Sequence, residues 1–286
     1  MGFVREIHEQ YQKAYAKAIA YQQKNKKNSL PVCPISLEGV LNERMISYRQ
    51  DLGIMEIPTN LIVGVAEKSY EMFLFSKEFF PVSQPNSTTA EQWRQAYSEL
   101  LIEKKSTTQI VCYEYLGKFY VSDGLMQVSV AKFAGIPMIQ SQVIRVMPNN
   151  TDCKEVELYF DFLTQYRLTD LYQIQFTQPG FFEEMQRALG KKHSEQWTEH
   201  DRTVFLSFWP VIENAYRESF DDFLSITAAD AFVVLLRKFA YRQILRMDSW
   251  MLARILQTCW KELYSLNCSG TESSPNSEIA NSLQTA

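Results

Sequence analysis

Five residues within one short stretch, Ser122, Asp123, Gly124, Gln127 and Ser129, have the types and spacing expected of a small anion-binding site. The acidic residue and the glycine end an apolar run, and the residues that follow predict a short helix. The first N–H groups of a helix have no partner within it, and the helix dipole favours negative charge at that end. The stretch therefore predicts a pocket for a nucleotide-like or other small anion.

The side chains of this stretch limit the chemistry that the pocket could perform. Asp123 is the one acid placed to act on a bound ligand, and that role competes with capping the helix. The three histidines, His8, His193 and His200, are distant in sequence, so we do not expect a histidine general base. A plainer interpretation stays open, in which Asp123 and Gly124 only end a strand and cap a helix.

The sequence does not predict a metal or a cofactor. His193, Glu199, His200 and Asp201 are close in sequence, but they include no pair of histidines four residues apart, and the acids fit a helix cap. The chain has no P-loop, dinucleotide-binding glycine pattern or serine-nucleophile motif. Its five cysteines are widely spaced, and we expect them to be reduced thiols.

The elements that position these residues have strong local signals. Two β-branched and aromatic runs within residues 110–121 meet at Gly117, which predicts a hairpin. A helix is expected at 125–134, ending at Gly135. Residues 138–146 then predict the next strand.

This order of elements resembles the core of the ParB and sulfiredoxin superfamily. The resemblance lies in the acidic-glycine turn at Asp123, the Val-Ser-Val-Ala sequence of the helix and the closing Gly-Ile-Pro. An upstream segment, residues 55–64, is similar to that superfamily's entry strand. Over residues 30–266 the chain is similar to an uncharacterised group in Gram-positive bacteria, whose ParB-like region often precedes a periplasmic-binding-like domain.

Two departures from the family pattern change the chemistry that the resemblance implies. Nucleotide-binding members have an arginine three residues after the turn glycine, where this chain has Gln127, and sulfiredoxins have Cys, His and Arg where it has Leu125, Met126 and Gln127. Losing one charge-assisted hydrogen bond to phosphate costs about 1.5–3 kcal/mol, or about ten- to a hundredfold in affinity. Lys68 and Lys77 are the only candidates for a further phosphate contact in the region that supplies one in the resembled folds. We therefore expect a pocket that is retained in shape and weakened or altered in chemistry.

The resemblance and the order of the predicted elements imply an α+β protein, with a small mixed sheet, helices around it and a helical C-terminal region. Of the 286 residues, 46% are hydrophobic and 13% aromatic, which is enough to form a core. The pattern divides the chain into an N-terminal amphipathic helix at 1–29, a ParB/sulfiredoxin-like core at 30–150, a mostly helical region at 151–266 and a disordered tail at 267–286.

Further elements are expected on both sides of the pocket stretch. Hydrophobic periodicity predicts helices at 2–28, 37–51, 67–79, 90–105, 155–166 and 179–189, and a strand at 171–176. The side chains expected on the buried side near the third of these helices are Tyr70, Phe73, Leu74 and Phe80.

Capping residues mark the expected starts of several helices. Thr88 or Thr89 is expected to cap the helix that follows, and Pro179 to occupy a first helical turn. Capping-box patterns at Thr198 and Thr227 predict two longer helices in the C-terminal half.

The distribution of charge disfavours nucleic acid as a partner. Residues 29–226 carry 26 acidic and 17 basic side chains, a net charge of −9. Contacts to the phosphate backbone dominate nucleic-acid affinity, and an acidic surface repels that backbone. Residues 227–264 have a net charge of +3, so DNA binding through the C-terminal helices stays open as an alternative.

Two functions from different classes fit these residues. The first is a non-catalytic ligand-sensing or protein-interaction module, whose pocket binds a nucleotide-like ligand weakly or not at all and whose aromatic C-terminal region contacts an unknown protein. The second is a ParB-like nucleotide hydrolase or nuclease that uses Asp123, Gln127 and a divalent metal. The missing phosphate-binding arginine favours the first. We expect no membrane association and a cytoplasmic location, because the chain has no long apolar run and no signal-peptide pattern.

Overall fold

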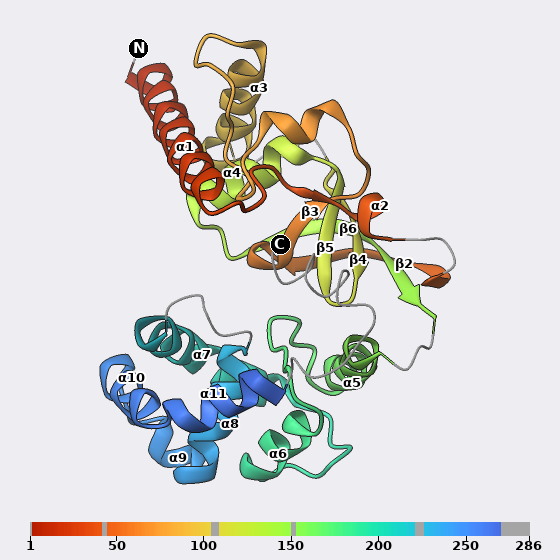
Figure 1. Cartoon of the computed structure of the whole chain (residues 1–286), viewed down its shortest axis with the longest axis vertical. Coiled ribbons are helices and arrows are strands. Elements are labelled where there is room, and N and C mark those ends of the chain that lie inside the picture. The colour runs from red at the N-terminus through yellow and green to blue at the C-terminus, as the bar shows by residue number, and fades with distance from the viewer. Residues whose placement is uncertain (1, 42–44, 104–108, 150–152, 221–225, 270–286) are drawn as a thin grey trace. The chain divides into compact units, whose positions relative to one another are not determined.

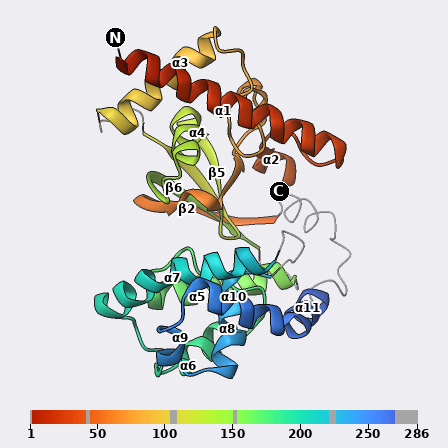
Figure 2. The ribbon, with the colours of Figure 1, turned by 90° about the vertical axis from the view of Figure 1, so that its left-hand side faces the viewer.

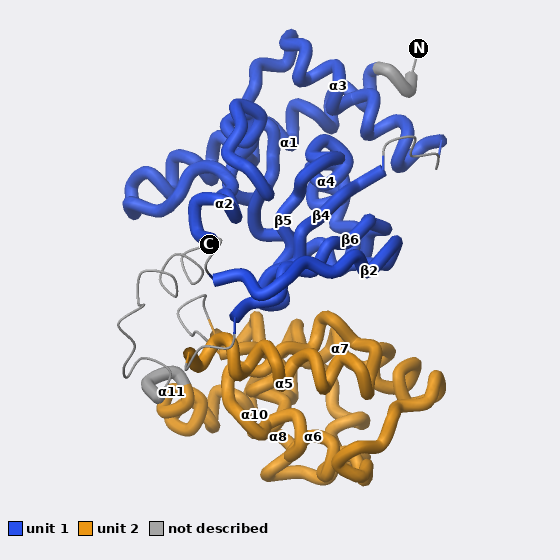
Figure 3. The backbone as a smooth tube through the Cα atoms, turned by 90° about the vertical axis from the view of Figure 1, so that its right-hand side faces the viewer, with its two compact units in different colours: residues 1–151, 276–286 blue, residues 152–275 orange. Residues whose placement is uncertain are grey.

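The computed structural model describes residues 2–41, 45–103, 109–149, 153–220 and 226–269. Contacts divide the chain into two compact units, residues 1–151 with 276–286 and residues 152–275, called unit 1 and unit 2 here (Figure 3). The fold is the predicted α+β class, with a mixed sheet in unit 1 and helices in unit 2. The division falls one residue from the boundary expected after residue 150, and it groups the N-terminal helix with the sheet.

Unit 1 is built on a six-stranded mixed sheet with the strand order β1-β3-β5-β4-β6-β2 (Figure 1). The strands β1, β3 and β5 run parallel to one another, β4 is antiparallel to β5 and parallel to β6, and β2 is antiparallel to β6. Their bounds are Ile35–Ser36 for β1, Ile46–Pro58 for β2, Ile62–Val65 for β3, Val111–Tyr115 for β4, Lys118–Asp123 for β5 and Met138–Pro148 for β6.

The hairpin and the helix after it form as the sequence predicts. Strands β4 and β5 are joined by a two-residue turn in which Leu116 and Gly117 both have positive φ, the geometry that suits the right-handed twist of a hairpin. Helix α4 spans Leu125–Ala134 and ends at Gly135, whose left-handed conformation a glycine adopts without steric cost. Strand β6 then begins at Met138, as predicted, and extends two residues further than expected.

The helices α1 (Gly2–Lys27) and α3 (Thr88–Tyr97) pack with α4 in unit 1 (Figure 2). The π-helical turn η4 (Ser98–Ile102) continues α3. The centre of this packing is Trp93, which is fully buried and lies edge-on to the rings of Tyr11 and Phe133. Three helices from distant parts of the sequence are therefore held together by one aromatic cluster.

Two of the helix predictions for unit 1 are wrong. The segment expected to be helical at 37–51 has only the short helix α2 (Leu37–Val40), and β2 follows because it pairs with β6 along its length. The segment at 67–79 has only the 3₁₀ turn η3 (Tyr70–Leu74), before an isolated bridge between Phe75 and Pro81. Tertiary pairing overrides the local helical pattern in both places.

The side chains expected to face inward near η3 do not all do so. Tyr70 is 79% exposed and Phe73 is 50% exposed, whereas Leu74 and Phe80 are half-buried. A single 3₁₀ turn places side chains three apart on one face, so Tyr70 and Phe73 share the outer face. The cap of α3 also differs from expectation, because Ser87, and not Thr88 or Thr89, accepts the N–H of Ala90.

In the described residues of unit 2, all the regular secondary structure is helical. A single core cluster contains Phe205, Trp209, Phe232 and Leu256 and connects several of its helices. The helices are α5 (Lys154–Thr169), α6 (Phe181–Ala188), α7 (Glu199–Ser219), α8 (Ala228–Lys238), α9 (Tyr241–Ile244), α10 (Ser249–Thr258) and α11 (Trp260–Ser269).

Both predicted capping boxes are present. Thr198 and Asp201 exchange side-chain-to-backbone hydrogen bonds at the start of α7, and Thr227 and Asp230 do the same at the start of α8. Each pair satisfies two backbone N–H groups that the helix leaves free. The two helices therefore begin where the sequence predicts.

Other predictions for unit 2 need correction. The strand expected at 171–176 is irregular chain, whose carbonyl at Ile174 accepts a hydrogen bond from the Gln165 amide. Pro179 lies outside α6, because Gly180 in a left-handed conformation is its N-cap. The tail predicted to be disordered from residue 267 begins as the last turn of α11, and residues 270–286 lie outside the described part of the chain. Among the described helices, none combines the length and the apolar character that a membrane crossing requires.

Candidate functional site

A cavity of about 610 Å³ lies at the junction between β5 and α4. It is at the carboxyl ends of the parallel strands β3 and β5, and η3 and α3 provide other walls. The crevice beyond the carboxyl ends of parallel strands is where ligands bind in open α/β sheets. The backbone geometry of this unit therefore places a ligand-sized space at the stretch that the sequence singled out.

Gly124 is the N-cap of α4, and its φ of 84° is in the left-handed region. A Cβ on this residue would come within 2.8 Å of Ile110, so a larger side chain is excluded on two grounds. The prediction that Ser122 or Asp123 caps the helix is wrong, since α4 has no side-chain cap among the described residues. Asp123 instead accepts the N–H of Gly124 at 2.7 Å, one residue too early to reach the first turn. The first turn of α4 thus begins at the cavity, and no side chain of the described residues caps it.

Gln127 is the third residue of α4 and lines the cavity. The residue is 7% exposed, and no side-chain hydrogen bond joins it to another described residue. Its amide is not among the buried polar atoms that are cut off from solvent without a partner, so it is open to the cavity. Gln127 therefore presents its donors and its acceptor to the cavity.

The structure brings together four of the five predicted site residues. Ser122, Asp123, Gly124 and Gln127 all line the cavity, and the first two are exposed. Ser129 does not line it, because it lies about 200° around the helix from Gln127. The Ser129 hydroxyl instead accepts a hydrogen bond from the Trp93 indole at 2.9 Å in the core of unit 1. Ser129 thus has a structural role here.

The charge around the cavity is negative, which the local sequence pattern did not predict. Its lining residues include the four acids Glu67, Glu71, Glu99 and Asp123 and no lysine, arginine or histidine among the residues that the structure describes. The sequence analysis missed the three glutamates because they come from separate segments. The regional net charge of −9 over residues 29–226 was the available signal. This charge opposes the binding of a polyanion.

The lysines that could have met a phosphate are placed elsewhere. Lys68 and Lys77 do not line the cavity, and burial lowers the pKa of Lys77. Lys132, on α4, donates to the carbonyl of Ile62 at 2.7 Å and lies over the Phe79 ring. Burial lowers the pKa of Lys132 to about 8. Among the residues that the structure describes, the cationic character at the cavity therefore comes from the start of α4 itself.

A second cavity, of about 290 Å³, lies within unit 2 between α5 and the start of α6. Its walls include Asp161, Glu183 and His193, and burial together with the charge of Glu183 raises the pKa of Asp161. His193 pairs with Glu183 at 3.3 Å, and Asp201 serves as a capping residue. Within the described chain, no three His, Cys, Asp or Glu side chains are grouped as a metal site requires.

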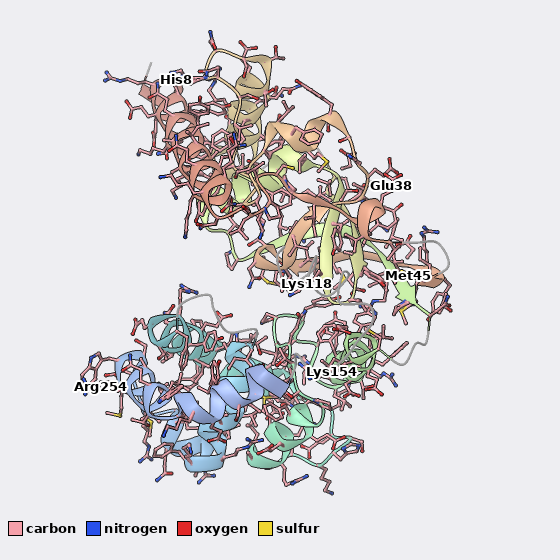
Figure 4. All side chains as sticks on the ribbon, in the orientation of Figure 1. His8, Glu38, Met45, Lys118, Lys154 and Arg254 are labelled. Atoms are coloured by element: carbon pink, nitrogen blue, oxygen red, sulfur yellow. The ribbon has the colours of Figure 1, made fainter. Side chains whose placement is uncertain are left out.

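The basic residues of the C-terminal helices are partly neutralised within unit 2. Arg237, on α8, pairs with Glu184 at 2.7 Å and with Glu262 at 3.1 Å, and Lys238 also pairs with Glu262. Arg254 on α10 is exposed and lies over the Trp250 ring (Figure 4). These pairings reduce the positive field that a DNA phosphate would meet.

Comparison with known proteins does not assign the chain to a family. No protein-family model matches the sequence. A search of curated proteins also found no match. The ParB/sulfiredoxin resemblance therefore stays a hypothesis that rests on the residues of the turn and its neighbouring elements.

Proposed function

We propose that the protein is a non-catalytic ligand-sensing module of the ParB/sulfiredoxin type, in which the cavity at the start of α4 binds a small molecule. The observation that carries this proposal is the buried Gln127, which lacks a partner among the described residues and lines the cavity. A helix start without a side-chain cap in the described chain and a glutamine amide that faces the same cavity together provide the hydrogen-bonding groups of a binding site.

The lining residues support binding without catalysis. Asp123 is the one acid of the β5–α4 turn, and one of its oxygens already accepts the Gly124 N–H. The described lining contains no cysteine, lysine or histidine that could serve as a nucleophile or base beside it. Nucleotide hydrolysis would also require a metal to offset the phosphate charge, in a cavity whose acids are not grouped as metal ligands.

The same lining supports a loss of nucleotide affinity. A triphosphate would meet the carboxylates of Glu67, Glu71, Glu99 and Asp123. In the resembled pattern an arginine at position 127 would offset part of this repulsion, and Gln127 cannot. We infer that bare nucleotides bind this cavity weakly or not at all.

A protein partner for unit 2 is the second part of this proposal. Trp250 on α10 is a large side chain that is exposed to solvent. Trp260 and Tyr264 on α11 are also exposed, and their two rings lie next to each other. Exposed aromatic groups of this size are enriched where one protein binds another. Such a contact would let ligand binding be read out by another protein.

A thermal-shift screen of the full chain against nucleotides, with and without magnesium, tests the proposal. A ligand at a hundred times its dissociation constant stabilises a protein by about 2.7 kcal/mol, a shift of several degrees. We expect no shift for the wild type and a measurable one for Gln127→Arg, which adds the missing charge in a cavity with room for it. Metal-dependent nucleotide turnover by the wild type that is lost in Asp123→Ala would overturn the proposal.

A further inference from the structure

We propose that the cavity at the start of α4 binds a small zwitterion, a molecule with one carboxylate and one ammonium group such as a free α-amino acid. This inference rests on the proposed function, because it names the ligand class for the same site. It replaces the anion expected from the sequence with a ligand that has no net charge. Its basis is the combination of an open helix start, a buried amide without a partner and a wall of acids.

The start of α4 is the position for the carboxylate. The helix has ten residues, and no side chain caps its first turn among the described residues. Its free N–H groups and its dipole favour a negative group there. The only acid beside it, Asp123, is engaged with the N–H of Gly124 and does not reach the first turn. A ligand carboxylate would therefore replace the missing cap.

Gln127 is the independent sign that a ligand belongs at this place. It is 7% exposed, lines the cavity and has no hydrogen-bond partner in the described chain. A glutamine amide has both donors and an acceptor, so it can bind either charged group of a zwitterion. Because the amide lines the cavity, a ligand there can bind to it directly.

Three glutamates of the lining are the position for the ammonium group. Glu67, Glu71 and Glu99 come from the segment after β3, from η3 and from η4, and all three line the cavity. A metal ion would need several ligands in one group, and the described residues contain no such group of three. An ammonium has three N–H donors and is satisfied by one or two carboxylates with water or an amide. The acids of the described lining therefore fit an amine better than a metal.

The size and the apolar part of the lining restrict the ligand further. A volume of about 610 Å³ is in the middle of the range for small-molecule sites. Val65, Leu74, Phe75 and Met126 give part of the lining an apolar character. We therefore expect an amino acid with an apolar or aromatic side chain to bind more tightly than a short polar one.

Calorimetric titration of the full chain tests this inference with leucine, methionine and phenylalanine as probes. For each probe, the amide lacks the carboxylate and the N-acetyl derivative lacks the ammonium group. We expect at least one free amino acid to bind, and both of its derivatives to bind at least about tenfold more weakly. Absence of binding by all three probes, or an amide derivative that binds as tightly as its parent, would overturn the inference.

Variants then test the residues assigned to each group. Gln127→Leu, and the double change of Glu67 and Glu71 to glutamine, should each weaken the bound amino acid by about tenfold or more. The matched control is Glu56→Gln, which removes an exposed acid of β2 outside the cavity and should leave the affinity unchanged. Unchanged binding in both cavity variants would place the ligand elsewhere and contradict the proposal.

The outcomes separate this inference from the proposed function. A flat nucleotide screen together with no amino-acid binding removes the zwitterion and leaves the non-catalytic module in place. Nucleotide turnover that depends on Asp123 overturns the non-catalytic module itself. Amino-acid binding that requires both the carboxylate and the ammonium group supports the zwitterion inference and the proposed ligand-sensing function.

Discussion

Helices α4 and α8 each have a buried polar residue as their third residue. The two residues differ in the hydrogen bonds that they make. In unit 2, Asp230 at the start of α8 is fully buried and accepts three hydrogen bonds, two from Thr177 and one from the backbone N–H of Thr227, whose hydroxyl donates to the Gln175 carbonyl. In unit 1, Gln127 at the start of α4 is nearly as buried and has no partner among the described residues. One helix start is completed by the protein itself and the other is open.

This difference indicates which of the two helix starts is a candidate for ligand binding. A capped start with all its hydrogen bonds satisfied contributes to stability and leaves no group free for a ligand. An uncapped start beside a cavity keeps its donors available at some cost in stability. The predictions below test this contrast, from the largest expected effect to the smallest.

Replacing Asp230, the buried residue of the capping box of α8, should have the largest effect on stability. Asp230→Ala removes the acceptor of three hydrogen bonds and leaves the backbone N–H groups of Thr177 and Thr227 and the Thr177 hydroxyl without this partner, so unit 2 should lose about 3 kcal/mol of its free energy of unfolding. Asp230→Asn keeps one acceptor oxygen and should lose less. Urea denaturation followed by circular dichroism measures both. A loss of less than about 0.5 kcal/mol in the alanine variant would contradict the assigned role.

The second prediction concerns the glycine at the open start. Gly124→Ala must adopt a φ of 84° and also bring its Cβ to 2.8 Å from Ile110, so it should destabilise unit 1 by about 2 kcal/mol. Gly135→Ala is the matched control, because it has a φ of 69° and nothing within 4 Å of the added Cβ. It should lose only about 1 kcal/mol. Equal losses in the two variants would show that the contact with Ile110 does not matter.

The third prediction compares two glutamines by the free energy of unfolding. The Gln127 amide is open to the cavity and has no partner in the described chain, so Gln127→Leu should change the free energy of unfolding of the ligand-free protein by less than about 0.5 kcal/mol. Gln165 is the control, since it is 1% exposed and its amide donates to the carbonyl of Ile174. Gln165→Leu should lose about 2 kcal/mol. Urea denaturation measures both, and a similar loss in the two variants would show that Gln127 also makes a hydrogen bond within the protein.

The smallest expected effect is on the pH dependence of stability, and it concerns Asp201 in the capping box of α7. The hydrogen bond from Lys191 holds the pKa of Asp201, the third residue of α7, at about 2. The folded pKa lies below the ordinary value, so this contribution is present above about pH 4 and is lost as the pH falls toward 2. The pair is partly exposed to solvent, which reduces the contribution to about 1 kcal/mol. In Asp201→Asn, the stability between pH 5 and pH 2 should fall less than in the wild type, as thermal denaturation at each pH can measure.

Local signals were sufficient to predict part of the fold and part of the site. The hairpin at Gly117, helix α4 with its end at Gly135, and the boxes at Thr198 and Thr227 each depend on residues within a few positions of one another. The four site residues that line the cavity were found in the same way, from one turn. The ParB/sulfiredoxin resemblance and the functions drawn from it stay predictions.

Long-range packing decided the rest. Residues 46–58 form a strand because they pair with β6, which lies far along the chain, and no local pattern contains that partner. Ser129 became a core residue because the Trp93 indole reaches it from α3, and the acids of the cavity came together from η3, η4 and the end of β3. The sequence by itself determined where α4 begins and which residues of its own segment, Ser122 to Gln127, lie at that start. Only the tertiary structure decided that the start is open, because the free N–H groups, the unpaired amide and the acidic wall depend on what other segments place, or do not place, around them.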